Sequence, residues 1–172
     1  MLNNKIADLI NDQINKELYS GYLYLEFANY CEEQGLDGFA NWYEIQAKEE
    51  RDHAVIMRRY LLDNGYRVTL DAIAKPVTNI TCPMDVFKAG VKHEQYVTSL
   101  INNIYSEAFA IKDFKTMQFL DWFIKEQVEE EKNAEDLVKK MELFGNDSKS
   151  LYLLNQELGS RAYVPTAMLK GE

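Results

Sequence analysis

A glutamate and a histidine one helical turn apart are the residues of this sequence best suited to bind a metal ion together. Glu50 and His53 lie in the run Glu49-Glu50-Arg51-Asp52-His53, inside a stretch with a helical pattern of apolar residues. Residues three apart share one face of a helix, so both side chains can reach a single ion. A Glu-x-x-His pair is a weak signal alone, and its weight depends on what the rest of the chain brings to it.

Three further glutamates each fall in the middle of the apolar stripe of another expected helix. They are Glu17, Glu94 and Glu130, and Gln127 lies one turn before the last of them. A single glutamate of this kind can reach water at the edge of a helix, but four central ones would be buried and would repel one another. A multivalent cation removes both costs, so the set predicts a metal site.

The elements that must position these side chains are four long helices and one short helix. Turn signals at Gly35, Asn64-Gly65 and Gly145 separate the apolar-periodic stretches. We expect helices over residues 4–34, 37–63, 84–112, 113–144 and 148–158. The chain should therefore be an all-α four-helix bundle, with a short fifth helix after it.

The segment from Gly65 to Pro83 has little helical periodicity and connects the second and third helices. Extended, it can span roughly 60 Å, whereas the second helix is about 40 Å long. We expect a long crossover that makes these two helices parallel. The four glutamates then lie at comparable distances from the helix turns and can meet near the middle of the bundle.

Composition limits the classes of function. The 172 residues carry a formal net charge of -9, which disfavours a nucleic-acid partner. Cys31 and Cys82 have no CxxC spacing, so a disulfide framework or thiolate zinc site is not expected. We see no signal peptide and no membrane-spanning segment. We expect a cytoplasmic protein with one domain over residues 1–172, its bundle covering about 4–144.

Carboxylates with one imidazole suit iron or manganese, and a bridging Glu50 would allow two ions. In this pattern the chain resembles the ferritin superfamily, whose dinuclear site takes one Glu from each of two helices and Glu-x-x-His from each of the others. It departs in the fourth helix, where Gln127-Val128-Glu129-Glu130 replaces a second Glu-x-x-His. It looks more like the bacterial non-haem ferritins, which oxidise iron and pass it to a store, than like the oxygenases that retain a permanent diiron cofactor.

The resemblance covers nearly the whole chain and implies a ligand set. The first iron would bind Glu17, Glu50 and His53; the second Glu50, Glu94 and Glu130, with Gln127 nearby; a third Glu49, Glu126, Glu129 and the shared Glu130. Glu49, Glu126 and Glu129 could equally form a solvated acidic edge. Tyr24, two turns after Glu17, could hydrogen-bond a ligand, donate an electron or simply fill the core.

The function implied is ferroxidase activity with iron storage. Fe(II) would be oxidised by dioxygen or hydrogen peroxide and deposited as ferric oxide mineral inside a shell of twenty-four subunits. We expect no haem, because Arg51 follows Glu50 where haem-binding bacterioferritins have methionine. Leu151, Leu154 and Leu158 form an apolar stripe on the fifth helix. We expect this stripe to support assembly, because it would be awkward to expose on a monomer.

Two alternatives remain open. One is a diiron or dimanganese oxidase or oxygenase, which needs a pocket for an organic substrate. The other is a metal-free helical scaffold, in which Glu17, Glu50 and Glu94 would pair with buried Lys or Arg residues.

Overall fold

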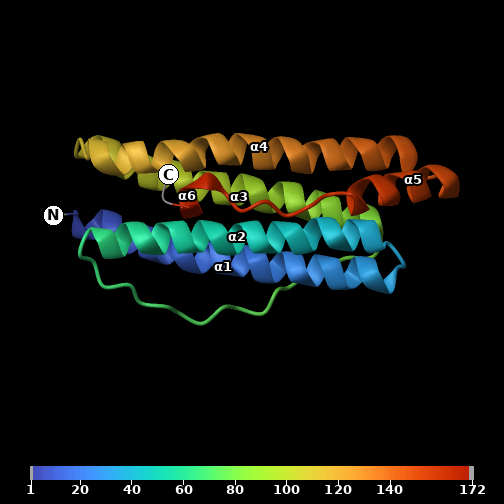
Figure 1. Ribbon diagram of the computed structural model, residues 1–172, viewed down its shortest axis with the longest axis horizontal. Coiled ribbons are helices and arrows are strands. Elements are labelled where there is room, and N and C mark those ends of the chain that lie inside the picture. Colours follow the sequence, from blue (N-terminus) through green and yellow to red (C-terminus); the bar gives the residue numbers. More distant parts are fainter. Residues whose placement is uncertain (1, 171–172) are drawn as a thin grey trace.

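Helices make up most of residues 2–170, the part of the chain that this computed structural model describes (Figure 1). No strand occurs within those residues, so the prediction of an all-α bundle is confirmed. The ends of the predicted domain, residues 1 and 171–172, lie outside the described part. The helices are α1 (Asn4–Glu33), α2 (Asp37–Asp63), α3 (Pro83–Ala110), α4 (Phe114–Phe144), α5 (Ser148–Gly159) and α6 (Ala167–Lys170).

Short polar side chains cap the N-termini of α1, α4 and α5, and glycines follow the ends of α1 and α2. The side chains of Asn3, Asp113 and Asp147 accept hydrogen bonds from backbone N–H groups in the first turns of α1, α4 and α5. Gly35 and Gly65 have φ values of 71° and 73°, a conformation that glycine adopts without strain. These local signals explain why the predicted bounds lie within about two residues of the observed ones.

The crossover between α2 and α3 runs along the length of the bundle, as predicted (Figure 1). Its first half is tied to α1: Asn11 Nδ2 donates to Thr69 O at 3.0 Å, and Thr69 N donates to Asn11 Oδ1 at 3.0 Å. Because the chain returns to the far end before α3 begins, α2 and α3 are parallel. α1 is antiparallel to α2, and α3 to α4.

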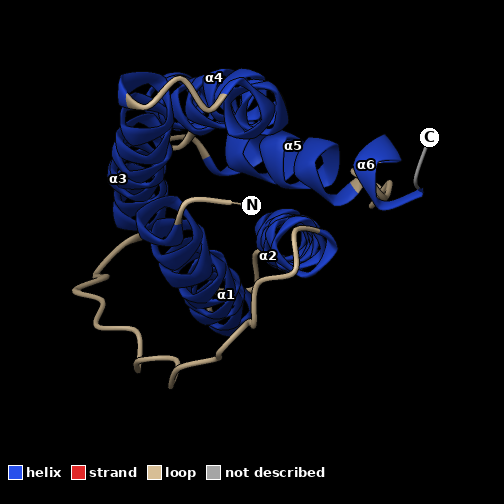
Figure 2. Ribbon diagram, turned by 90° about the vertical axis from the view of Figure 1, so that its left-hand side faces the viewer, coloured by secondary structure: helices blue, strands red, loops and turns tan. Residues whose placement is uncertain are grey.

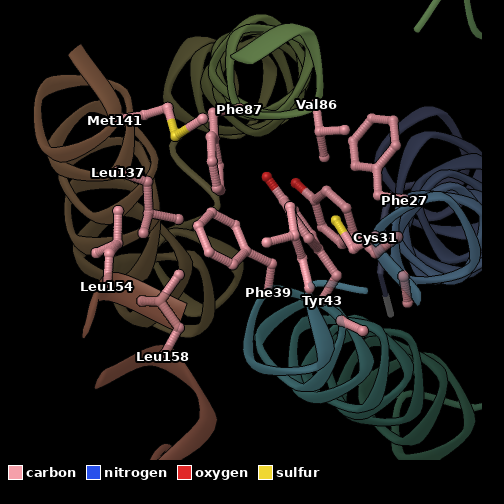
Figure 3. Packing of buried hydrophobic residues seen from close by; sticks show 14 of the residues in the cluster. Phe27, Cys31, Phe39, Tyr43, Val86, Phe87, Leu137, Met141, Leu154 and Leu158 are labelled. Carbon is pink, nitrogen blue, oxygen red and sulfur yellow. The ribbon is translucent and has the colours of Figure 1, made fainter. Parts of the chain in front are cut away.

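The core consists of two apolar clusters, one toward each end of the bundle. The cluster at the α5 end includes Phe39, Tyr43 and Phe87, which pack face to face or tilted (Figure 3). The other cluster contains Ile10, Met57 and other side chains from all four long helices. The buried polar residues identified below belong to neither cluster.

Helix α5 buries its apolar stripe against its own bundle, which corrects one expectation. Leu154 and Leu158 are 4% and 2% exposed in the α5-end cluster, and Leu151 packs against it. The stripe therefore carries no argument for assembly. Asn155 Oδ1 also accepts hydrogen bonds from the backbone N–H groups of Gly38 and Phe39 at the start of α2, at 2.9 and 3.2 Å.

The chain after α5 was not predicted to have any structure. It turns back along the bundle beside α2 and ends in the short helix α6, on a different face from the crossover (Figures 1 and 2). Met168 and Leu169 pack against the second apolar cluster, and Arg59 Nη1 donates to Leu169 O at 2.8 Å. None of the helices within residues 2–170 is long and apolar enough to cross a membrane.

Candidate metal centre

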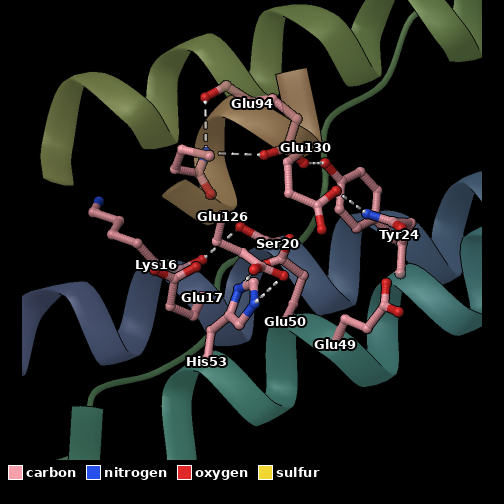
Figure 4. Close-up of polar contacts among 12 residues, drawn as sticks. Lys16, Glu17, Ser20, Tyr24, Glu49, Glu50, His53, Glu94, Glu126 and Glu130 are labelled. Carbon is pink, nitrogen blue, oxygen red and sulfur yellow. Dashed lines mark hydrogen bonds and ion pairs between the residues drawn. The ribbon is translucent and has the colours of Figure 1, made fainter. Parts of the chain in front are cut away.

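Polar side chains from α1, α2, α3 and α4 converge at mid-bundle (Figure 4). The four glutamates predicted there are all buried, with exposed fractions between 1% and 5%. The sequence predicted this convergence, because the four glutamates lie at comparable distances from the helix turns. The buried polar residues here are Glu17, Gln46, Glu50, His53, Glu94, Gln127 and Glu130.

Glu17, Glu50 and His53 form the most compact group of potential ligands. One ligand atom from each lies within 4.8 Å of the others, and all three side chains are buried. Glu17 Oε2 and Glu50 Oε2 have no hydrogen-bond partner, although His53 Nδ1 lies 3.4 Å from the latter. Buried carboxylate oxygens without a donor are costly, and a cation between the helices would satisfy both.

Glu94 and Glu130 face this group from α3 and α4, but each is already hydrogen-bonded. Tyr24 Oη donates to Glu94 Oε1, and Gln127 Nε2 donates to Glu94 Oε2 at 3.2 Å. Gln46 Nε2 donates to Glu130 Oε2 at 2.7 Å. Of the roles considered for Tyr24, the geometry shows two: the hydrogen bond to Glu94 and packing in the apolar cluster at the α5 end, where Tyr24 is 2% exposed.

Burial makes the metal-free site retain protons. It raises the pKa of Glu130 to about 8, with repulsion from Glu94 adding to the shift. Burial also raises the pKa of Glu94, and it raises that of Glu50 well above the ordinary range. Burial alone would lower the pKa of His53, but Glu126 and Glu50 outweigh it and raise the pKa. A cation entering the site would displace such protons.

The residues assigned to a third site by resemblance are dispersed at the rim. Glu126 Oε1 lies 3.9 Å from His53 Nε2, so this carboxylate reaches toward the centre. Glu49 instead pairs with Arg161, whose Nη2 donates to Glu49 Oε2 at 2.7 Å. Glu129 is exposed on α4, and its side chain takes part in none of the hydrogen bonds or ion pairs found among residues 2–169.

Sequence reasoning identified Gln127 but missed Gln13 and Gln46, two other amides that bond to the glutamates. Gln13 Nε2 donates to Glu17 Oε1 at 3.0 Å from one turn earlier in α1, a spacing that could have identified it. Gln46 has the same spacing from Glu50 but binds Glu130 on α4, which no local rule predicts. Arg161 was missed because it lies beyond every expected helix.

The second histidine, His93, does not replace the one missing from α4. Although it precedes Glu94, its Nε2 lies 2.8 Å from Ser20 Oγ. Burial lowers the pKa of His93 to about 4. The candidate centre therefore has a single imidazole, as the sequence indicated.

Both alternative functions lose support from the geometry. Among residues 2–169, no Lys or Arg pairs with Glu17, Glu50 or Glu94, although the metal-free scaffold requires such pairs. The cavity that touches Glu94 and Glu130 has a volume of about 10 Å³. That volume is about one water molecule and too small for an organic substrate.

Comparison with known proteins gives a consistent result. The model of the ferritin-like domain family matches residues 7–144. A bacterial non-heme ferritin of Staphylococcus saprophyticus is 38% identical over 163 residues, 95% of this chain and 98% of the relative. The corresponding Staphylococcus aureus protein is 36% identical with the same coverage.

Solved structures of an archaeal ferritin have the same fold. An open-pore ferritin from the hyperthermophilic archaeon Archaeoglobus fulgidus superimposes with a TM-score of 0.92 at 40% identity, covering 94% of this chain and all of that one. An engineered closed form of it gives a TM-score of 0.93 at 40% identity, covering 95% of this chain and all of the other.

Proposed function

Since this chain belongs to the ferritin family, we propose that it takes up Fe(II), oxidises it at a dinuclear carboxylate centre and stores the product as a ferric oxide mineral. The observation that carries the proposal is the group Glu17, Glu50 and His53, with two buried carboxylate oxygens that lack partners. Glu94 and Glu130 complete the set from the opposite helices.

The proposed ligands divide between two iron ions. Glu17, Glu50 and His53 hold the first, which their spacing supports. Glu50, Glu94 and Glu130 hold the second, with Gln127 beside them. Glu50 is the bridging ligand, because its helix also carries His53 and its Oε2 is unpartnered.

The redox chemistry belongs to the iron, which is the substrate. Each of two Fe(II) ions loses one electron, and the pair of electrons with two protons converts dioxygen to hydrogen peroxide, or hydrogen peroxide to water. The protein holds the two ions at one site and offsets their charge with carboxylates. Tyr24 and Gln127 orient Glu94 through the hydrogen bonds described above.

The two ions are held unequally, which suits a storage protein. The first iron has an imidazole ligand, whereas the second has Gln127 where a second histidine would stand. With fewer strong ligands, the second iron leaves more readily after oxidation. We propose that this iron then passes to a third site formed by Glu49, Glu126 and Glu129. The approach of Glu126 to His53 supports this site.

We further propose that the chain is one ferritin-like domain that assembles into a shell of twenty-four subunits. Packing of α5 against both α2 and α4 supports the single domain. Large exposed side chains support assembly: Phe109, Phe114, Tyr152 and Leu153 are each 59–67% exposed. A cytoplasmic location is consistent with the free thiols of Cys31 and Cys82.

Aerobic Fe(II) titration tests this function. The oxidation rate, followed by absorbance and corrected for the protein-free rate, is compared between wild type and the double variant His53→Ala, Glu94→Ala. We expect the variant to lose at least about 100-fold in initial rate, because each ion loses a ligand. Size-exclusion chromatography with iron analysis checks that both proteins assemble. Equal rates in two assembled proteins would refute the assigned centre.

A further inference from the structure

The segment that follows α5 brings an arginine to the rim of the proposed iron centre. Residues 160–166 leave α5 and run along α2, where Arg161 and Tyr163 make side-chain contacts. Tyr163 Oη donates to Asp52 Oδ2 at 2.5 Å. The segment is thus attached to the outer face of the helix that carries Glu49, Glu50 and His53. The role inferred below for Arg161 in this segment rests on the iron-oxidising function proposed above.

The Arg161 guanidinium makes a specific set of contacts. Nη2 donates to Glu49 Oε2 at 2.7 Å, and Nη1 donates to Gln46 Oε1 at 2.6 Å and to Trp42 O at 3.4 Å. The guanidinium carbon also lies 4.1 Å from the centre of the Trp42 ring. A planar, permanently charged fork is suited to this combined recognition, which an ammonium could not reproduce.

Arg161 is connected to Glu130 as well as to Glu49. Because the Gln46 oxygen accepts from Arg161, the Gln46 amide nitrogen faces α4 and donates to Glu130 Oε2 at 2.7 Å. One guanidinium therefore orients two of the four carboxylates of the proposed third site.

A guanidinium and an iron ion cannot share Glu49 Oε2. Arginine has donors only and stays protonated, so it neutralises Glu49 while no metal is present and must leave that oxygen when a cation binds. The side chains of Arg161 and Glu49 are 20% and 22% exposed, and ion pairs open to water are weak enough to exchange. A surface pocket of about 440 Å³ beside Arg161 and Trp42 gives the guanidinium room to move.

We propose that Arg161 is a positioning residue and a displaceable counter-ion for the third iron site. It holds Glu49 and, through Gln46, Glu130 in place when the site is empty. It yields Glu49 to iron that leaves the dinuclear centre. It thereby lowers the affinity of the third site, so that this site passes iron on rather than retaining it. The bond from Tyr163 to Asp52 keeps the segment on α2 while Arg161 moves.

Equilibrium binding of Tb(III), a redox-inert trivalent probe that prefers oxygen ligands, tests the proposal on the assembled protein. A Glu49→Gln variant first defines which Tb(III) sites depend on Glu49. We expect Arg161→Gln to increase the Tb(III) affinity of only those sites, by about two- to fivefold, which corresponds to the loss of one partly exposed ion pair. Arg161→Lys should tighten them less. Arg58→Gln is the matched control, which removes the same charge from an exposed position of α2 and should leave the affinity unchanged.

A second readout follows the movement itself. With Trp122→Phe, Trp42 is the only tryptophan, because the chain has two. Filling the Glu49-dependent site should shift Trp42 emission in this background but not when Arg161→Gln is added. Three results would overturn the proposal. The first is that no Tb(III) site depends on Glu49, and the second is that Arg161→Gln binds Tb(III) as tightly as wild type or more weakly. The third is that Trp42 emission shifts by the same amount in the variant without Arg161. Failure of the proposed function is separate: a Glu50→Gln variant would then bind Tb(III) as wild type does.

Discussion

At the scale of single residues, burial raises the pKa of three carboxyls of the centre, those of Glu50, Glu94 and Glu130. No lysine or arginine within residues 2–169 pairs with Glu17, Glu50 or Glu94. Amide donors bond to the carboxyls of the centre instead, as from Gln13 to Glu17 and from Gln46 to Glu130. Such partners can be given up when a cation arrives, whereas a buried lysine or arginine would oppose it.

This arrangement predicts that the metal-free protein loses stability as pH rises. The pKa of Glu130 is about 8 when folded and near its ordinary value of about 4.3 when unfolded. Between these values the folded state binds more protons than the unfolded state. The contribution of Glu130 to the free energy of unfolding should therefore be fully present below about pH 4.5. It should fall on the order of 1 kcal/mol per pH unit toward pH 8.

Urea unfolding in the presence of a chelator, at several pH values across that window, measures the slope. Glu130→Gln is the matched variant, because it keeps the shape and removes the titration. The variant should show a shallower slope than wild type. A stability that rises with pH across the same window in wild type would contradict the assignment of a protonated Glu130.

At the scale of elements, the docking of α5 onto α2 depends on close backbone contact. A Cβ added at Gly38 would lie 1.7 Å from Asn155 O, so the two helices would have to separate. Asn155 also caps α2, which makes the contact both steric and polar.

Gly38→Ala should consequently destabilise the protein by about 1–3 kcal/mol, the usual cost of overpacking. Thermal unfolding of the metal-free protein measures the loss. Gln156→Ala on the exposed side of α5 serves as the control and should change stability by less than about 0.5 kcal/mol. Equal stabilities for the two variants would mean that α5 does not dock on α2 as described.

At the scale of the whole molecule, the centre connects the four long helices. Glu17 comes from α1, Glu50 and His53 from α2, Glu94 from α3 and Glu130 from α4. Iron ions bound by these residues stabilise the folded chain by mass action.

Anaerobic Fe(II) at about 100 times its dissociation constant should add about 2.7 kcal/mol, which for a chain of this size raises Tm by about 5–10 °C. Calorimetry with and without Fe(II) measures the shift. Glu50→Gln should abolish most of it, since this residue is the proposed bridge. A full shift in that variant would place the stabilising iron elsewhere.

The sequence by itself determined the helices, the crossover and the glutamates. Helix bounds follow from local signals such as Asn3, Gly35 and Gly65. Helical periodicity places each glutamate in the apolar stripe of its helix, and a buried carboxylate is costly without a partner, so the sequence also indicates a cation. Only the tertiary structure decided the partners. The apolar stripe of α5 is buried by its own bundle, Gln46 bonds to Glu130 rather than to Glu50, and Arg161 reaches Glu49 across 112 residues. Such contacts depend on how distant segments meet in space, which no spacing along the chain specifies.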